Sequence, residues 1–139
     1  MTEAPVPTVL AILICEKLIT EANTQNKTLV NVFNNIDARD FPTAFGPLSL
    51  FIRLADAEGD YVLKLAITRL ESEETISAPE LPIVTIPSRL SIHELNIKIP
   101  GIGFKEPGTY EFQLYANNVW IARTTLTVAR RDPSKNLEK

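Results

Sequence analysis

The sequence predicts an all-β fold, a two-sheet antiparallel β-sandwich of immunoglobulin-like type with seven to eight strands. Apolar and polar residues alternate over several short segments, the period of a strand with one face in a core and the other in water. Glycine, proline and asparagine separate these segments at the short intervals typical of β-sandwiches. No segment has the apolar spacing of an amphipathic helix. Together these observations favour two stacked sheets over an α/β fold.

The clearest strands form a hairpin near the C-terminal end of the sequence. A Pro-Gly pair at 107–108 allows a sharp turn before the alternating segment Thr109–Tyr115. A turn at Asn117-Asn118 then leads into a second alternating segment, Val119–Val128. Tyr110 follows a turn and precedes a core position by two residues, which is the position of a tyrosine corner.

Two strands and an irregular stretch are predicted in the first part of the chain. Residues 1–7 are expected to form a flexible lead-in. Thr8–Lys17 is the first predicted strand, and its apolar residues are continuous, which indicates that it is covered on both faces. Thr28–Asn35 follows as the second strand after a polar loop. Ile36–Pro47 contains two X-Pro pairs, and because a residue before proline avoids the helical region, we expect this stretch to be irregular.

A second hairpin is predicted in the middle of the chain. Leu48–Ala55 and Tyr61–Leu70 alternate on either side of a turn at Gly59. Glu71–Pro79 is acidic and loses the alternation, so we expect it to be a connection. Leu81–Ile86 is bounded by prolines, which cannot donate to a neighbouring strand, and is therefore predicted to be an edge strand if it pairs.

The next predicted strand is Ser88–Pro100. A change of phase in its apolar residues indicates a bulge at His93-Glu94. Gly101–Phe104 is expected to be a glycine-flanked loop before the terminal hairpin. The sequence becomes polar after this hairpin, so we predict a single domain over residues 8–129 and a polar tail at 130–139.

Composition argues against several classes of function. The 139 residues carry a net charge of -3, whereas nucleic-acid binding needs a basic face. No run reaches the ~18 apolar residues of a membrane span, and the N-terminal apolar run lacks the basic residues of a signal peptide. The single cysteine, Cys15, is expected to be buried and unreactive. We therefore expect a cytoplasmic protein that binds neither nucleic acid nor membranes.

The sequence predicts no catalytic, metal or cofactor site. The one histidine, His93, lies in a strand segment without the neighbours that a catalytic triad or a zinc site needs. Asp56, Glu58 and Asp60 surround a tight turn and could begin a calcium site, but no calcium-loop pattern continues. The glutamates of 71–74 are expected to be a solvated loop rather than an acid–base pair.

Aromatic residues near turns are the candidate binding residues. Tyrosine and tryptophan are enriched at binding surfaces because they join apolar area to a polar group. The alternative for Trp120 is that its side chain closes the end of the core. The candidate set consists of turn and loop residues: Tyr115, Trp120, Asn117, Asn118, Phe41 and Phe104.

Several segments are similar to those of a family of small bacterial proteins that is classified as a domain of unknown function. They are L-A-I-L-I-C-E-K-L-I-T, K-T-L-V-N-V-F-N-N-I, an F-P pair before a strand, P-G-T-Y-E-F-Q-L-Y and T-L-T-V. The resemblance covers Val9–Val128, and Cys15 and Lys27 stand where the family has a cysteine and a lysine. It implies the fold and a bacterial cytosolic setting, but no activity, because no catalytic residues are established for the family.

The sequence favours a non-enzymatic module that binds another protein through the candidate aromatic residues. Self-association of the chain through an exposed sheet edge is compatible with this reading. The alternative is a small-molecule or carbohydrate-binding module, in which Tyr115 and Trp120 stack on a sugar ring.

Overall fold

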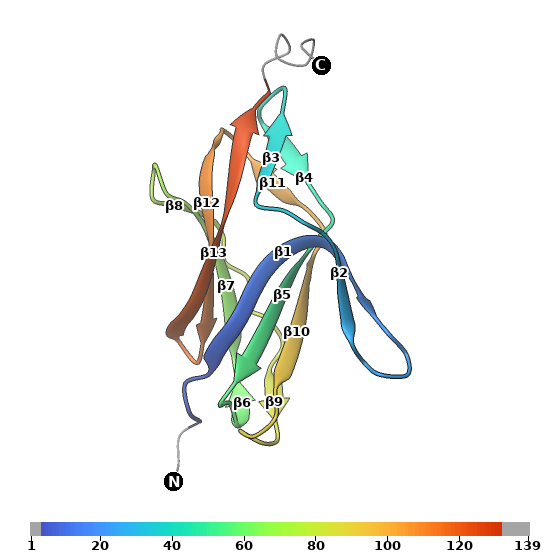
Figure 1. Cartoon of the computed structure of the whole chain (residues 1–139). Coiled ribbons are helices and arrows are strands. Elements are labelled where there is room, and N and C mark those ends of the chain that lie inside the picture. The colour runs from blue at the N-terminus through green and yellow to red at the C-terminus, as the bar shows by residue number, and fades with distance from the viewer. Residues whose placement is uncertain (1–3, 132–139) are drawn as a thin grey trace.

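The computed structural model describes residues 4–131, and this range contains strands but no helix (Figure 1). The all-β prediction is therefore confirmed. The described range has thirteen strands, more than the seven to eight predicted, because short strands of three or four residues supplement the longer ones. The strands are β1 (Thr8–Thr20), β2 (Lys27–Val32), β3 (Asn35–Ala38), β4 (Thr43–Phe45), β5 (Leu48–Ala55), β6 (Gly59–Tyr61), β7 (Leu63–Arg69), β8 (Glu74–Ser77), β9 (Val84–Ile86), β10 (His93–Ile99), β11 (Ile102–Phe104), β12 (Gly108–Ala116) and β13 (Val119–Arg130).

These strands form two larger and two smaller sheets. The four-stranded sheet has the order β10-β5-β1-β2, and the five-stranded sheet has the order β3-β13-β12-β7-β8. The two-stranded sheets are β11-β4 and β6-β9. Neighbouring strands run antiparallel, apart from β3, which lies parallel to β13. Because β2 and β3 are consecutive, the chain crosses from one larger sheet to the other between Val32 and Asn35.

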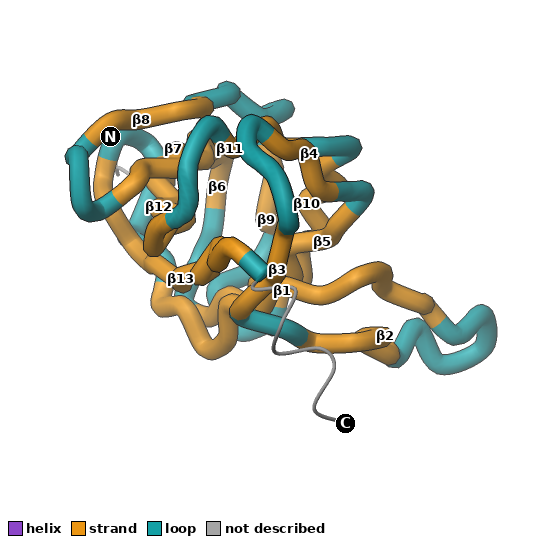
Figure 2. The backbone as a smooth tube through the Cα atoms, turned by 90° about the horizontal axis from the view of Figure 1, so that it is seen from above, coloured by secondary structure: helices purple, strands orange, loops and turns teal. Residues whose placement is uncertain are grey.

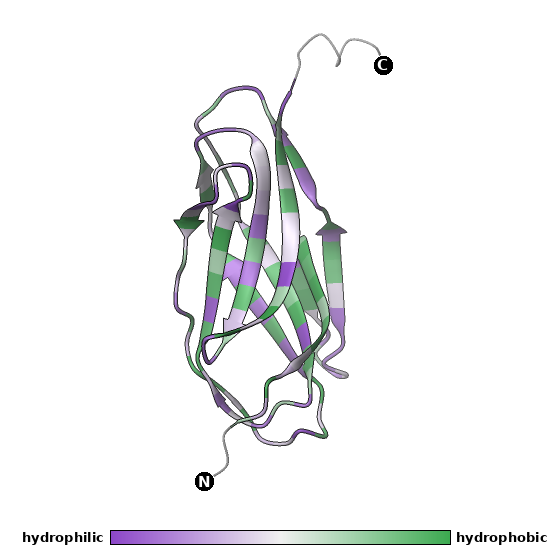
Figure 3. Cartoon of the chain, turned by 90° about the vertical axis from the view of Figure 1, so that its left-hand side faces the viewer, coloured by the Kyte–Doolittle hydropathy of each residue, from purple (hydrophilic) through white to green (hydrophobic). Residues whose placement is uncertain are grey.

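One apolar core is shared by the two larger sheets. Alternate residues of β5 and β12 supply its centre, and Figure 3 shows this alternation as green and purple bands along the strands. The fully buried members from these two strands and from β7 are Leu48, Leu50, Ile52, Leu54, Leu63, Leu65, Ile67, Tyr110, Phe112 and Leu114. The period of two in the sequence thus identifies the core faces of the central strands.

Three segments for which the sequence predicts irregular structure are partly strands. Ile36–Pro47 contains parts of β3 and β4, Glu71–Pro79 contains β8, and Gly101–Phe104 contains β11. β3 pairs with β13 and β4 with β11, so these strands depend on remote partners and not on a local pattern. The β7–β8 pairing shifts register between Ile67 and Thr68, which removes the regular alternation from this hairpin.

β10 differs from the prediction in a simpler way. The bulge predicted at His93-Glu94 is wrong, because β10 begins at His93 and pairs with β5 in unbroken register as far as Ile99. The change of phase in the sequence arises because Ile92 precedes the strand. The prolines around Leu81–Ile86 limit regular pairing in this segment to the short strand β9.

β1 is longer than predicted, and it is not covered on both faces. Its apolar residues Leu10 and Leu13 are 51% and 40% exposed. Cys15 lies opposite both Ser49 of β5 and Val32 of β2, so the strand changes partner at this point. Beyond it, residues 16–31 form a two-stranded hairpin, here called the β1–β2 arm, which projects from the body of the molecule (Figure 2).

The chain is fixed before β12 by the side chain of Tyr110. Its hydroxyl donates to the carbonyl oxygen of Glu106 at 2.6 Å, and its ring packs edge-on against Phe104 at a centroid distance of 4.7 Å. The bond spans four residues and turns the chain into the core strand, as a tyrosine corner does.

Gly108 lies at a close approach in the same turn. A Cβ atom there would come within 2.6 Å of Arg69 and 2.8 Å of Glu71. The Arg69 guanidinium donates to the carbonyl oxygen of Pro107 at 2.7 and 3.0 Å, and the Glu71 carboxylate accepts from the Thr109 amide at 3.0 and 3.1 Å. The hydrogen bond from Thr109 lowers the pKa of Glu71. Glycine at 108 therefore lets these two side chains close over the turn.

Tyr110→Phe should lower the free energy of unfolding by about 1–2 kcal/mol, because it leaves the ring in place and removes the hydroxyl that satisfies the Glu106 carbonyl. Urea unfolding measures this change. Tyr115→Phe is the control, since its hydroxyl makes a longer bond of 3.3 Å on the outer face; we expect a loss below about 0.5 kcal/mol. Equal losses in the two variants would contradict a structural role for the Tyr110 bond.

Candidate binding surface

The turn between β12 and β13 consists of two residues in the left-handed region. Asn117 has φ of 49° and Asn118 has φ of 67°. Two consecutive residues with positive φ are the signature of a type I′ hairpin turn, and asparagine tolerates this conformation better than other side chains with a Cβ. The Asn-Asn pair therefore forms the tight connection between these two long strands.

Asn117 also fastens this turn to the neighbouring chain. Its Oδ1 accepts from the amide of Val62 at 2.9 Å, and its Nδ2 donates to the carbonyl oxygen of Asp60 at 3.3 Å. Its own amide donates to the carbonyl oxygen of Val62 at 2.9 Å. The polar groups of Asn117 are thus occupied within the fold, and its role is to position the hairpin.

A bulge places Trp120 on the outer face of the five-stranded sheet. Leu114 pairs with Ala122 but Tyr115 pairs with Trp120, so Ile121 is an extra residue in β13. An extra residue reverses the side on which the following positions point, and it brings Trp120 beside Tyr115. The two rings stack with centroids 6.2 Å apart and planes at 29°. Trp120 is 51% exposed, so it does not close the core.

A chain of hydrogen bonds continues from the aromatic pair along the outer face. The Tyr115 hydroxyl donates to Gln113 at 3.3 Å, and the Gln113 amide donates to the Glu111 carboxylate at 2.7 Å. The other Glu111 oxygen accepts from the Arg123 guanidinium at 3.0 Å. We call the surface formed by Gln113, Tyr115, Trp120 and Arg123 the aromatic face.

Glu111 is the buried anchor of the aromatic face. It is 4% exposed although its strand position points outward, because Gln113 and Arg123 lie over it. The hydrogen bond from Gln113 and then that from Arg123 lower the pKa of the carboxyl group, against the opposing effect of burial. The sequence alternation marks this residue as an ordinary exposed position, so sequence reasoning does not indicate its role.

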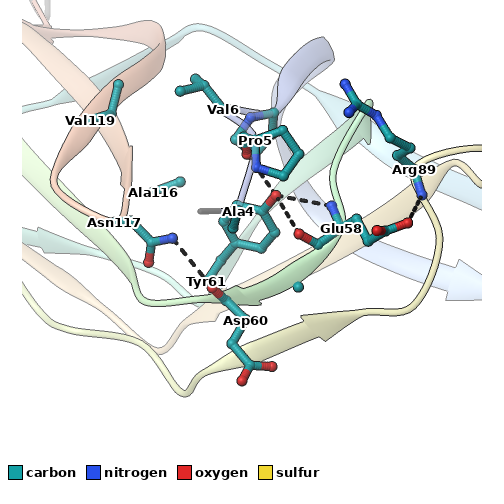
Figure 4. Close-up of a pocket in the computed structure, with 12 residues that line it drawn as sticks. Ala4, Pro5, Val6, Glu58, Asp60, Tyr61, Arg89, Ala116, Asn117 and Val119 are labelled. Atoms are coloured by element: carbon teal, nitrogen blue, oxygen red, sulfur yellow. Dashed lines mark hydrogen bonds between the residues drawn. The ribbon is translucent and has the colours of Figure 1, made fainter. Parts of the chain in front are cut away.

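A hollow of about 810 Å³ adjoins the hairpin turn at the end of the molecule (Figure 4). Its walls come from the N-terminal segment, from β6 and from the β12–β13 hairpin, where Val119 borders it beside Trp120. The Tyr61 hydroxyl donates to the carbonyl oxygen of Pro5 at 2.6 Å and accepts from the amide of Glu58 at 3.0 Å. The bond to Pro5 holds the N-terminal segment against the hollow.

The structure does not bring Phe41 and Phe104 together with the aromatic face. Phe104 is fully buried in the core, so it is removed from the candidate set. Phe41 is half-buried, and the Arg130 guanidinium lies over its ring at 5.0 Å. Arg130 and Trp120 are at opposite ends of β13, about 33 Å apart along a strand of this length. The predicted patch is therefore divided between two ends of the molecule.

The titratable candidates are dispersed. The carboxylates around Gly59 turn to different partners, since Asp56 accepts from Thr8 and Asp60 from Thr85. No group of three potential metal ligands occurs within residues 4–131.

Cys15 is fully buried, and burial raises its pKa. Among the residues that the structure describes, no helix has the length and apolar character needed to cross a membrane.

Comparison with known proteins gives a family but no activity. A family model described as a family of unknown function, DUF6941, matches residues 10–129. No curated protein matches the sequence.

Asn117→Ala should lower the free energy of unfolding by roughly 2–3 kcal/mol, because it removes two side-chain hydrogen bonds and places alanine in the left-handed region. Asn118→Ala is a matched control with the same backbone strain, and its side chain makes no hydrogen bond to the described residues. We expect about half the loss there. Urea unfolding of both variants separates the two effects, and identical losses would contradict the positioning role of Asn117.

The lowered pKa of Glu111 predicts a pH-dependent contribution to stability. Because the folded pKa lies below the unfolded value of about 4.3, the contribution is complete above that unfolded value and is lost as the pH falls through the folded pKa. Glu111→Gln should be less stable than wild type by roughly 1–3 kcal/mol near neutral pH and should approach wild type in acid. Urea unfolding at several pH values tests this, and a difference independent of pH would count against it.

Proposed function

The chain belongs to the DUF6941 family, whose function is unknown, and we propose that it is a non-enzymatic module whose aromatic face binds another protein. The observation that carries the proposal is the bulge at Ile121, which directs a half-exposed tryptophan away from the core and onto Tyr115. If the pairing instead continued in unbroken register, Trp120 would lie opposite the buried Ala116 and point inward, where its apolar area would contribute to folding.

The composition of the aromatic face supports protein recognition. Tryptophan, tyrosine and arginine are the residues that most often dominate binding energy at protein interfaces. Here all three lie on β12 and β13, with Trp120 and Tyr115 in contact and Arg123 on the same face. Thr125 and Thr127 continue the face along β13, so it offers a broad surface of small and aromatic side chains.

The side chains of the aromatic face are held in place before any partner binds. The Trp120 indole Nε1 donates to the carbonyl oxygen of Ala122 at 2.9 Å, and Arg123 is tied to the buried Glu111. A side chain that is already fixed loses less conformational entropy on association. This preorganisation supports binding more directly than catalysis, because the one carboxylate of the cluster is covered by its hydrogen-bond partners.

A second candidate function is the binding of a small molecule or a sugar in the end hollow. The observation that favours it is the position of Val119 and Asn117, which line the hollow and belong to the hairpin that carries the aromatic pair. Trp120 is the one tryptophan of the sequence and directly follows Val119, so its fluorescence would report on a sugar that binds in the hollow or stacks on the aromatic pair. A titration with simple sugars that leaves the emission unchanged would count against this candidate.

We also propose that the two larger sheets form an immunoglobulin-like sandwich. The core that the two sheets share and the Tyr110–Glu106 hydrogen bond support this assignment. A bacterial cytoplasmic setting is proposed from the sequence resemblance and from the single buried cysteine.

The proposed function predicts that Tyr115→Ala/Trp120→Ala abolishes capture of a partner. Immobilised wild-type protein should retain one protein in stoichiometric amount from a lysate of the source organism. The double variant should retain about one tenth of that amount or less, since hot-spot residues contribute more than ~1 kcal/mol each to binding.

The control for this experiment is Leu90→Ala. Leu90 is an apolar residue outside the aromatic face, in the connection before β10, and its side chain is more exposed than that of Trp120 (94% against 51%). Circular dichroism establishes that each variant is folded. Equal capture by wild type and the double variant would overturn the aromatic face as the binding surface.

A further inference from the structure

β10 is a free edge of the four-stranded sheet. It pairs with β5 along its whole length, and no strand of the described range pairs with its other side. A strand in this position presents a row of backbone N–H and C=O groups to which another strand can add. The edge runs from His93 to Ile99, and Pro100 ends it.

The apolar side of this edge is incompletely covered. Leu95, Ile97 and Ile99 point to the core side, because residues directly opposite in a sheet share a face and their partners on β5 are core residues. These partners are at most 1% exposed, whereas the three residues of β10 are half-buried. A further hollow of about 190 Å³ lies beside Ile99, between β10 and the β7–β8 hairpin. An added strand would cover this apolar area.

The other side of β10 carries charges in a self-complementary order. Glu94, Asn96 and Lys98 share this side, and Asn96 is the midpoint of the strand. In a two-fold antiparallel pair centred on Asn96, Glu94 of each copy lies opposite Lys98 of the other. The same register sets Leu95 opposite Ile97 on the apolar side. Opposite charges and apolar residues placed directly across a strand pair both stabilise it.

The existing ion pairs leave Lys98 available for this contact. Glu94 lies 3.5 Å from Arg53 of β5, and Lys98 takes part in none of the ion pairs among residues 4–131. A lysine on an edge strand, without an opposite charge across from it, disfavours pairing with a second chain. A glutamate at the mirrored position instead gives the lysine of a second copy a partner.

We propose that two copies of the chain associate through antiparallel pairing of β10 with β10, centred on Asn96. The pairing would join the two four-stranded sheets through about six to eight backbone hydrogen bonds and would cover the apolar side of both edges. Closed two-fold contacts of this kind use the same surface on both copies. The aromatic face lies on the other large sheet, so this inference goes beyond the proposed function and does not depend on it.

Charge reversal tests the register of the pair. Glu94→Lys and Lys98→Glu should each weaken dimerisation by about tenfold or more, because each variant places like charges opposite one another in its own homodimer. An equimolar mixture of the two variants should dimerise as wild type does, because every charged pair across the heterodimer is then opposite in sign. Sedimentation equilibrium over a broad concentration range measures all four samples.

A cysteine at the symmetry axis gives an independent measurement. Asn96→Cys should oxidise to a covalent dimer, since the two copies of this position face each other, whereas Thr28→Cys on the exposed side of β2 should not. A wild-type chain that remains monomeric up to millimolar concentration would overturn the proposal. Dimerisation that neither charge reversal alters would overturn it too, because the contact would then lie elsewhere or engage a different occupant of the edge.

Discussion

The burial of the inward faces of β5 and β12 in one apolar core is the constraint on which the other features depend. Leu50, Ile52, Phe112 and Leu114 have no exposed surface, and their burial fixes which side of every neighbouring strand faces water. A slip of one residue in either strand would exchange the two sides, so the register of the central strands is strongly determined. The side chains of the aromatic face point outward because of this register and because of the β-bulge at Ile121.

The parts of the fold that could be predicted are those in which pairing and burial act on a regular local pattern. β5, β7, β12 and most of β13 show the period of two because one side of each lies in the core. β3 and β11 carry too few residues to show a period, and they exist because remote strands pair with them. For β10 the local pattern is misleading. Ile92 is an exposed apolar residue that precedes the strand, and counting it as a strand residue gives the change of phase that predicts a bulge.

The candidate site was predictable in composition and not in geometry. Turn residues point to the β12–β13 hairpin as the candidate, but the positioning role of Asn117 depends on Asp60 and Val62, which are far away in sequence. Phe104 is predicted to be a loop aromatic because two glycines precede it, whereas the β4–β11 pairing and its contact with Tyr110 place it in the core. Glu111 could not be found from the alternation, since its burial is produced by the side chains above it and not by its strand position.

The change of partner at Cys15 makes the β1–β2 arm a separable part of the molecule. The pairing of β1 with β5 ends at this residue, and beyond it the arm consists of two strands, an arrangement with little stability of its own. Opening of the arm would therefore cost far less than global unfolding, and its amides should exchange with solvent while the core remains protected. Evolution or engineering could lengthen, shorten or exchange this appendage without altering the packing of the two larger sheets.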